Sequence, residues 1–303
     1  MSLISIRHLR YFDALSQHGH FGRAAEACAI SQPALSLQVK ELEEVLGVSL
    51  IERGSRQIRL TSVGEAFVPR VREILRAIDE LGDLARASLS PLAGRLRIGM
   101  IPTVAPYLLP AFIKRLTEDF PDLDPRPREA VTQKLIEDLM DGRLDVAVVA
   151  LPVSEPSLYE QLLFDEEFML VRPLSDHDKP VPNSDVLREM RLLLLEEGHC
   201  FREQALSFCK MSPTVARELM EGSSLSTLVQ MVGVGLGVTL IPSMALATET
   251  ASAKVSVARL DAPRPSRSIG MVWRKTNPLA EGFSQIAEIL RQEHENHRLS
   301  SAV

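Results

Sequence analysis

The sequence predicts a small helical domain that ends in a β-hairpin, then a long linking helix, and finally a larger α/β domain of two subdomains. Three observations lead to this division. Helical periodicity with tight breaks fills the first 62 residues, a heptad-like apolar pattern follows, and strands then alternate with helices. A chain of 303 residues has room for two or three domains. The predicted boundaries are 1–62, 63–94 and 95–303.

Composition and charge are those of a soluble globular protein. Hydrophobic residues make up 45% of the chain and charged residues 24%, which excludes a disordered, collagenous or purely coiled-coil protein. The net charge is −6, so any binding of nucleic acid must come from a local site. No signal peptide is recognisable, and polar residues, Gly and Pro interrupt the long uncharged stretch 222–248. We therefore expect a cytoplasmic protein with no membrane segment, whose three cysteines are kept reduced.

Two short helices with a tight break between them are predicted within residues 21–46. The first has a face of small residues that includes Cys28, which we interpret as a core residue. Ser31 can cap the second helix, with Pro33 in its first turn and Gly47 as its stop. A further helix over 6–17 supplies the third side of a small core. This arrangement is a helix-turn-helix.

A β-hairpin is predicted next, with short strands over 50–53 and 57–60. Its arginines could reach phosphates while the second helix of the helix-turn-helix enters a major groove. A helical bundle with no DNA-binding role has the same periodicity, but it does not account for the tight turn between the helices or for the hairpin, which would form the wing of a winged helix-turn-helix. The candidate DNA-binding residues are Ser31, Gln32, Pro33, Ser36, Gln38, Lys40, Arg53, Arg56 and Arg59.

The first 65 residues resemble the DNA-binding domain of LysR-type transcriptional regulators. The resemblance rests on the alanine-rich helix before the turn and on the runs 31–36 (SQPALS), 50–53 (LIER) and 60–61 with Gly64. It implies an all-α winged helix-turn-helix domain that binds double-stranded promoter DNA as part of a dimer. It also implies a dimer of dimers in the full assembly, with RNA polymerase as a further partner.

One long helix is predicted over 61–87, followed by a polar hinge over 88–94. Its apolar residues recur at steps of three and four, the pattern of a short coiled-coil seam. A helix packed on its own domain would show the same pattern. We favour dimerisation with a second copy of the chain through Phe67, Val71, Ile74, Ile78 and Leu81.

From residue 95, strands alternate with helices, which predicts a parallel sheet with crossover helices. Within the LysR resemblance this is a periplasmic-binding-protein-like regulatory domain with a ligand cleft between its subdomains. Subdomain I covers 95–164 and 268–303, and subdomain II covers 165–267. Thr103, after the first strand, is placed to meet a small polar ligand in that cleft.

Cys200 and Cys209 lie in a segment where an apolar strand ends and a helix begins. Cys200 would stand near the helix N-terminus beside His199 and Arg202, where the helix dipole and both side chains favour a thiolate, while neighbouring glutamates oppose it. Nine residues of helix span roughly 13–14 Å, whereas a disulfide needs Cα atoms about 4.4–6.8 Å apart. A bond between the two cysteines would therefore require the helix to unfold. From the two cysteines alone, two inert buried thiols remain the simpler interpretation.

The run 198–209 (GHCFREQALSFC) resembles the redox centre of the peroxide-sensing members of the LysR family, and 101–104, 106–110 and 163–166 are similar as well. This resemblance implies that hydrogen peroxide oxidises Cys200 to a sulfenic acid, that Cys209 resolves it as a disulfide, and that a cellular dithiol resets the pair. Two features depart from the family pattern. Glu203 replaces a shorter acid, and the stretch 210–227 diverges. The residues implied in the peroxide pocket and in thiolate stabilisation are Thr103, Thr132, His199, Arg202, Glu203 and Arg267.

Two other functions are compatible with parts of the sequence. One is a LysR-type regulator switched by a metabolite in the cleft, with inert cysteines. The other is an enzyme such as a thiol peroxidase, which the DNA-binding half of the chain disfavours. No cofactor or metal is expected: the cysteine spacing is poor for zinc, and we interpret His294 and His297 as a solvated helix end.

Overall fold

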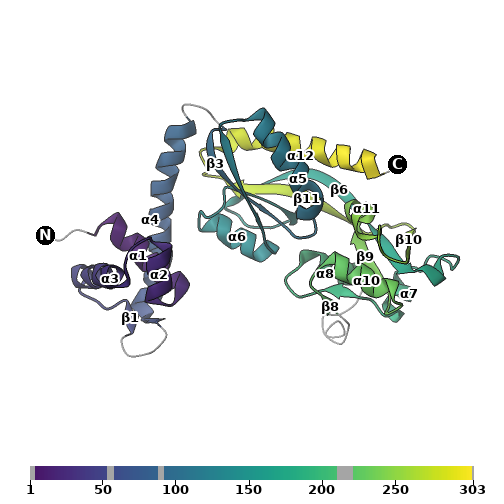
Figure 1. Ribbon diagram of the computed structural model, residues 1–303, viewed down its shortest axis with the longest axis horizontal. Helices are drawn as coiled ribbons and strands as arrows, with labels where there is room; N and C mark the ends of the chain where they lie inside the picture. Colours follow the sequence, from purple (N-terminus) through teal and green to yellow (C-terminus); the bar gives the residue numbers. More distant parts are fainter. Residues whose placement is uncertain (1–3, 53–57, 88–91, 210–220, 302–303) are drawn as a thin grey trace. The chain divides into compact units, whose positions relative to one another are not determined.

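The computed structural model of the protein describes residues 4–52, 58–87, 92–209 and 221–301. It divides into two compact units, Met1–Ala85 and Arg86–Val303 (Figure 1). In the described part of the chain, no helix is both long and apolar enough to cross a membrane.

The first unit is a three-helix core with a small hairpin. The predicted ends of its third helix are confirmed: the Ser31 hydroxyl accepts from the Ala34 N–H at 3.3 Å, and Gly47 ends the helix with φ +71°. Buried Glu43 accepts from the backbone N–H groups of Leu50 and Ile51 at 2.7 and 3.2 Å, which ties this helix to the hairpin. The elements are α1 (Ile6–His18), α2 (Phe21–Ala27), α3 (Gln32–Leu46), and the antiparallel strands β1 (Ile51–Glu52) and β2 (Arg59–Leu60).

The long helix α4 (Ser62–Ala87) packs its first half against this core, so Phe67 and Val71 of the predicted dimerisation seam contact their own unit. Val71 is fully buried beside Phe12, and the ring of Phe67 meets that of Phe12 edge-on at 5.7 Å. Val71 therefore belongs to the core of its own unit because it has no surface left for a partner. Further along α4, Ile74 is 48% exposed and Leu81 is 66% exposed, while Ile78 is partly buried.

The second unit is built on one mixed sheet with the strand order β10-β6-β11-β5-β3-β4, in which β10 is Val255–Arg259, and β9 (Thr239–Pro242) also pairs with β6. The predicted parallel pairing holds for β3 (Gly94–Met100) with β4 (Leu123–Glu129) and β5 (Val146–Leu151). The other strand pairs of this sheet are antiparallel, which corrects the prediction there, while the short strands Leu194–Leu195 and Glu221–Gly222 outside it pair in parallel. Because β6 (Leu158–Pro173) runs into the second subdomain and β11 (Ser266–Arg274) returns from it, these two strands are antiparallel. The two predicted boundaries between the subdomains, near residues 165 and 267, fall inside these two strands.

Helices cover the sheet and surround its far end. In Figure 1, α5 (Ala105–Asp119) and α12 (Ala280–Ser301) lie on one side of the sheet and α6 (Thr132–Met140) on the other. The remaining elements belong to the second subdomain. They are η1 (Leu174–Asp176), α7 (Ser184–Glu189), β7 (Leu194–Leu195), α8 (Cys200–Phe208), β8 (Glu221–Gly222), α10 (Leu225–Gly233), β9 (Thr239–Pro242), η2 (Ser243–Ala245), α11 (Leu246–Glu249) and β10 (Val255–Arg259).

Candidate functional site

Cys200 is the first residue of α8, as predicted. Gly198 turns the chain with φ +96°, a conformation that favours glycine, and the extended residue His199 precedes the helix. Cys209 directly follows the helix and is buried. Both thiols are free. Because α8 is continuous between the two cysteines, they lie at opposite ends of the helix.

A pocket of about 610 Å³ opens at Cys200. Two of its buried side-chain oxygens, Thr132 Oγ1 and Gln204 Oε1, have no hydrogen-bond partner within the described residues. Buried polar atoms are normally paired, so two lining residues of this pocket each carry an oxygen that could accept a hydrogen bond from a small ligand. Glu203 also lines the pocket. Thr132 and Glu203 are residues that the sequence implied, whereas Gln204 was missed although it lies within the resembling run.

Thr103 and Arg267 are joined directly to each other. Arg267 Nη1 donates to Thr103 Oγ1 at 2.7 Å, and Nη2 donates to the Thr103 carbonyl at 3.1 Å. The same guanidinium forms a fully buried ion pair with Glu166 at 2.7 Å. Its carbon lies 5.5 Å from the ring centre of Phe201, the neighbour of Cys200. Neither Thr103 nor Arg267 is among the residues that line the cysteine pocket, so Phe201 connects this cluster to α8.

Glu166 and Phe201 are site residues that the sequence did not single out. Glu166 ends the similar run 163–166, but nothing in the sequence shows that its partner is Arg267. Phe201 has the helical spacing of an ordinary core residue. Its contact with the Phe168 ring, at 4.7 Å, holds it against β6.

Arg202, which the sequence also implied near the thiol, contacts other parts of the second subdomain. Arg202 is not among the residues that line the pocket, and its guanidinium donates to the Leu195 carbonyl and pairs with Glu221, each at 2.7 Å. These contacts attach α8 to strands β7 and β8. Arg202 therefore positions α8, and its role in stabilising the thiolate stays a prediction.

Burial sets the protonation of His199 and Cys209. Desolvation lowers the pKa of His199, with partial opposition from Glu196 and Glu129, which favours the neutral imidazole. Desolvation also raises the pKa of the Cys209 thiol to about 11, so that Cys209 is protonated at neutral pH.

The candidate DNA-binding residues of α3 divide by their contacts. Ser31 caps the helix, and Gln38 donates to Glu41 at 2.6 Å, so both side chains already have partners. Lys40 is exposed and lies 3.3 Å from Glu44. Gln32, Pro33 and Ser36 form an exposed face of α3, and Arg59 is exposed on β2, while Arg53 and Arg56 lie outside the described residues.

No group of three or more His, Cys, Asp or Glu side chains in the described part of the chain is placed to hold a metal ion.

The chain is similar to known proteins along almost its whole length. Residues 6–65 match the bacterial regulatory helix-turn-helix protein, lysR family, and residues 90–295 match the LysR substrate binding domain. The DNA-binding transcriptional dual regulator OxyR of Escherichia coli K12 is 40% identical over 298 residues, covering 97% of each chain. A probable hydrogen peroxide-inducible genes activator of Streptomyces viridosporus is 41% identical over 294 residues, covering 95% of this chain and 94% of the relative.

Solved structures of full-length relatives have the same fold. A cysteine-to-aspartate variant of Pseudomonas aeruginosa OxyR matches with a TM-score of 0.76 at 36% identity, covering 96% of each chain. A cysteine-to-serine variant of Corynebacterium glutamicum OxyR with bound hydrogen peroxide matches with a TM-score of 0.68 at 35% identity, covering 99% of this chain and 96% of that one.

Proposed function

The chain belongs to the LysR family of bacterial helix-turn-helix regulatory proteins, and we propose that it controls transcription in response to hydrogen peroxide, which it senses through Cys200. The observation that carries this proposal is the position of Cys200, at the start of α8 in a pocket where two buried oxygens have no partner among the described residues. A peroxide molecule has two O–H donors and would satisfy both oxygens while one of its own oxygens meets the sulfur.

The first chemical step is attack of the Cys200 thiolate on one peroxide oxygen. An S–O bond forms and the O–O bond breaks, which leaves a sulfenic acid and a hydroxide that takes up a proton to become water. Cys200 is the first residue of α8, where the helix dipole interacts favourably with negative charge. The Phe201 ring is held in position by the guanidinium of Arg267, which is itself bonded to Thr103 and Glu166.

The second step joins the two cysteines. Cys209 attacks the sulfur of the sulfenic acid, an S–S bond forms, and the second peroxide oxygen leaves as water, so two thiols and one peroxide give one disulfide and two waters. Nine residues of α8 hold the cysteines about 13 Å apart along the helix axis, whereas a disulfide needs Cα atoms within about 7 Å. Disulfide formation therefore unwinds α8, and this unwinding is the proposed switch.

The consequences extend to the rest of the regulatory domain. Unwinding α8 moves Phe201 away from Arg267 and disturbs the cluster between β6 and β11, the strands that connect the two subdomains. A change in the angle between subdomains would alter a dimer of dimers and the spacing of its DNA-binding domains. We include promoter DNA, RNA polymerase and a resetting cytoplasmic dithiol as partners. The chain acts as a stoichiometric sensor, not as a peroxidase.

The test is the intact mass of the purified chain with thiol labelling, before and after one equivalent of hydrogen peroxide. We expect a loss of two hydrogens that maps to Cys200 and Cys209 and that a dithiol reverses. Cys209→Ser should stop at the sulfenic acid and lose the change in the DNA footprint. Cys28→Ser is the matched control, because Cys28 lies in the other unit, and it should respond like the wild type.

Two results would contradict the proposal. If Cys200 and Cys209 both stay free after peroxide, or oxidise only under a large excess, the cysteines are not the sensor. If the chain consumes many equivalents of peroxide per subunit with a reductant present, it is an enzyme.

A further inference from the structure

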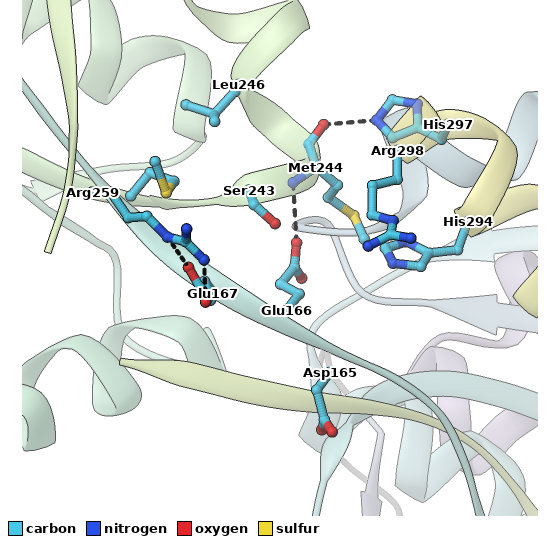
Figure 2. Close-up of a pocket in the computed structure, with 11 residues that line it drawn as sticks. Asp165, Glu166, Glu167, Ser243, Met244, Leu246, Arg259, His294, His297 and Arg298 are labelled. Carbon is cyan, nitrogen blue, oxygen red and sulfur yellow. Dashed lines mark hydrogen bonds and ion pairs between the residues drawn. The ribbon is translucent and has the colours of Figure 1, made fainter. Parts of the chain in front are cut away.

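A second pocket, of about 490 Å³, lies between α12 and the part of the sheet formed by β6 and β10 (Figure 2). Its volume is within the range that holds a small organic molecule. One wall consists of His294, His297 and Arg298 of α12, and the opposite wall carries the acidic residues 165–167 of β6. The cysteine residues do not line it, so it is separate from the proposed sensing site.

The acidic side chains of this pocket already have partners. Glu166 pairs with Arg267 at 2.7 Å, outside the pocket. Its other oxygen accepts from the Met244 N–H at 3.2 Å. Asp165 accepts from the Ser268 hydroxyl at 2.6 Å. Because these carboxylates already have hydrogen-bond or ion-pair partners, the pocket does not favour a cationic ligand.

The basic side chains are occupied in the same way. Arg259 makes two hydrogen bonds with Glu167, at 2.7 and 2.8 Å, and Arg298 pairs with Glu295 at 2.8 Å. His297 Nε2 is 2.8 Å from the Met244 carbonyl. An anionic ligand would have to displace one of these pairs, so the pocket does not favour an anion.

His294 is the exception. Its burial, and the contact of His297 with the Met244 carbonyl, correct our interpretation of these two residues as a solvated helix end. The side chain of His294 is more than nine-tenths buried, and its ring stacks on Phe164 with 3.6 Å between ring centres and 4° between planes. Its Nδ1 has no hydrogen-bond partner within the described residues. Figure 2 shows the ring directed from α12 toward the wall that carries Glu166. Burial lowers the pKa of His294 to about 4, so the imidazole is neutral at pH 7. A neutral imidazole whose buried Nδ1 has no partner among the described residues therefore lines this pocket.

We propose that this pocket binds a small neutral molecule that carries an aromatic ring and one hydroxyl group, with the hydroxyl bonded to the imidazole of His294. The paired charges around the pocket argue against an ionic ligand. The thioethers of Met169 and Met244 and the side chain of Leu246 supply apolar walls, and thioethers make favourable contacts with aromatic rings. The hydroxyl supplies the hydrogen bond that the imidazole lacks.

The test uses phenol as the probe on the full chain, in ligand-observed NMR and in titrations. Anisole, benzoate and benzylamine are the comparison probes, which respectively lack the hydroxyl proton, carry a negative charge and carry a positive charge. His294→Phe keeps the flat ring against Phe164 but removes both nitrogens. His177→Phe is the matched control, because His177 is exposed and outside the pocket.

We expect phenol to bind the wild type more tightly than all three comparison probes, and about five- to tenfold more weakly to His294→Phe, the loss of one hydrogen bond. Binding to His177→Phe should not change. In the wild type itself, phenol should shift the imidazole ¹⁵N resonances of His294 but not those of His177, a measurement that does not depend on the variant folding. The proposal is overturned if phenol does not bind, if benzoate or anisole binds as well as phenol, or if the His294 resonances do not move.

Discussion

Arg267 donates from Nη1 to Thr103 Oγ1 at 2.7 Å, although 164 positions separate the two residues in the sequence. This contact joins β11 to the segment before α5, and the ion pair with Glu166 adds β6. Phe201 of α8 lies on the face of the same guanidinium. The guanidinium is therefore shared by the sheet that connects the two subdomains and by the helix that carries Cys200.

Replacing Glu166 with Gln should destabilise the regulatory domain strongly. The guanidinium of Arg267 would remain buried without its counter-charge, and breaking such a pair costs about 3–5 kcal/mol. Glu167→Gln is the matched control, because Glu167 pairs with the exposed Arg259, and surface pairs contribute about 0–1 kcal/mol. Urea unfolding of both variants measures the difference. Equal stabilities for the two variants would contradict this account of the buried pair.

Much of the fold was predictable because local signals determine it. Ser31 and Gly47 fix the ends of α3, as their local cap chemistry predicts. The 16-residue strand β6 was missed because its charged residues mask the alternation of a strand. The antiparallel return of β11 depends on where the chain re-enters the sheet, which no local pattern shows.

The candidate site was predictable in its residues but not in its arrangement. The spacing placed Cys200 at a helix start, because that is a local property. The ion pairs of Arg267 with Glu166 and of Arg202 with Glu221 depend on tertiary contacts, which no local pattern shows. The apolar pattern of α4 could not separate a dimer seam from a core face, because both produce the same periodicity. Val71 and Leu81 both belong to this apolar pattern, yet Val71 is fully buried and Leu81 is mostly exposed.

Thr132→Val should slow the oxidation of Cys200 by peroxide about tenfold, the value of one hydrogen bond in the transition state. Folding stability should not fall, because Thr132 Oγ1 has no partner in the described structure. Thr117→Val, on the exposed surface of α5, is the control and should leave the rate unchanged. Stopped-flow mixing with peroxide, followed by quenched thiol labelling, gives the rates. An unchanged rate in Thr132→Val would remove Thr132 from the peroxide pocket.

The raised pKa of Cys209 should make the reduced chain less stable at alkaline pH. Between the ordinary thiol pKa of 9.0 and the folded value of about 11, the unfolded chain has released this proton while the folded chain retains it. Stability is therefore fully present below pH 9 and falls as pH rises toward 11, by about 2–3 kcal/mol for this group. Urea unfolding under reducing conditions at several pH values measures the slope. Cys209→Ala should lack this part of the decline, and an identical slope in both proteins would contradict it.

Val71→Ala and Leu81→Ala should separate the two roles of α4. Val71 is fully buried against Phe12, so its truncation should destabilise the first unit by about 1.5–3 kcal/mol. Leu81 is 66% exposed, so its truncation should change the stability of the subunit by less than about 0.5 kcal/mol. If the exposed half of α4 forms the contact with a second copy, Leu81→Ala should instead weaken self-association, as measured by sedimentation over a range of concentrations. A variant at Leu81 that assembles like the wild type would place the dimer contact elsewhere on the chain.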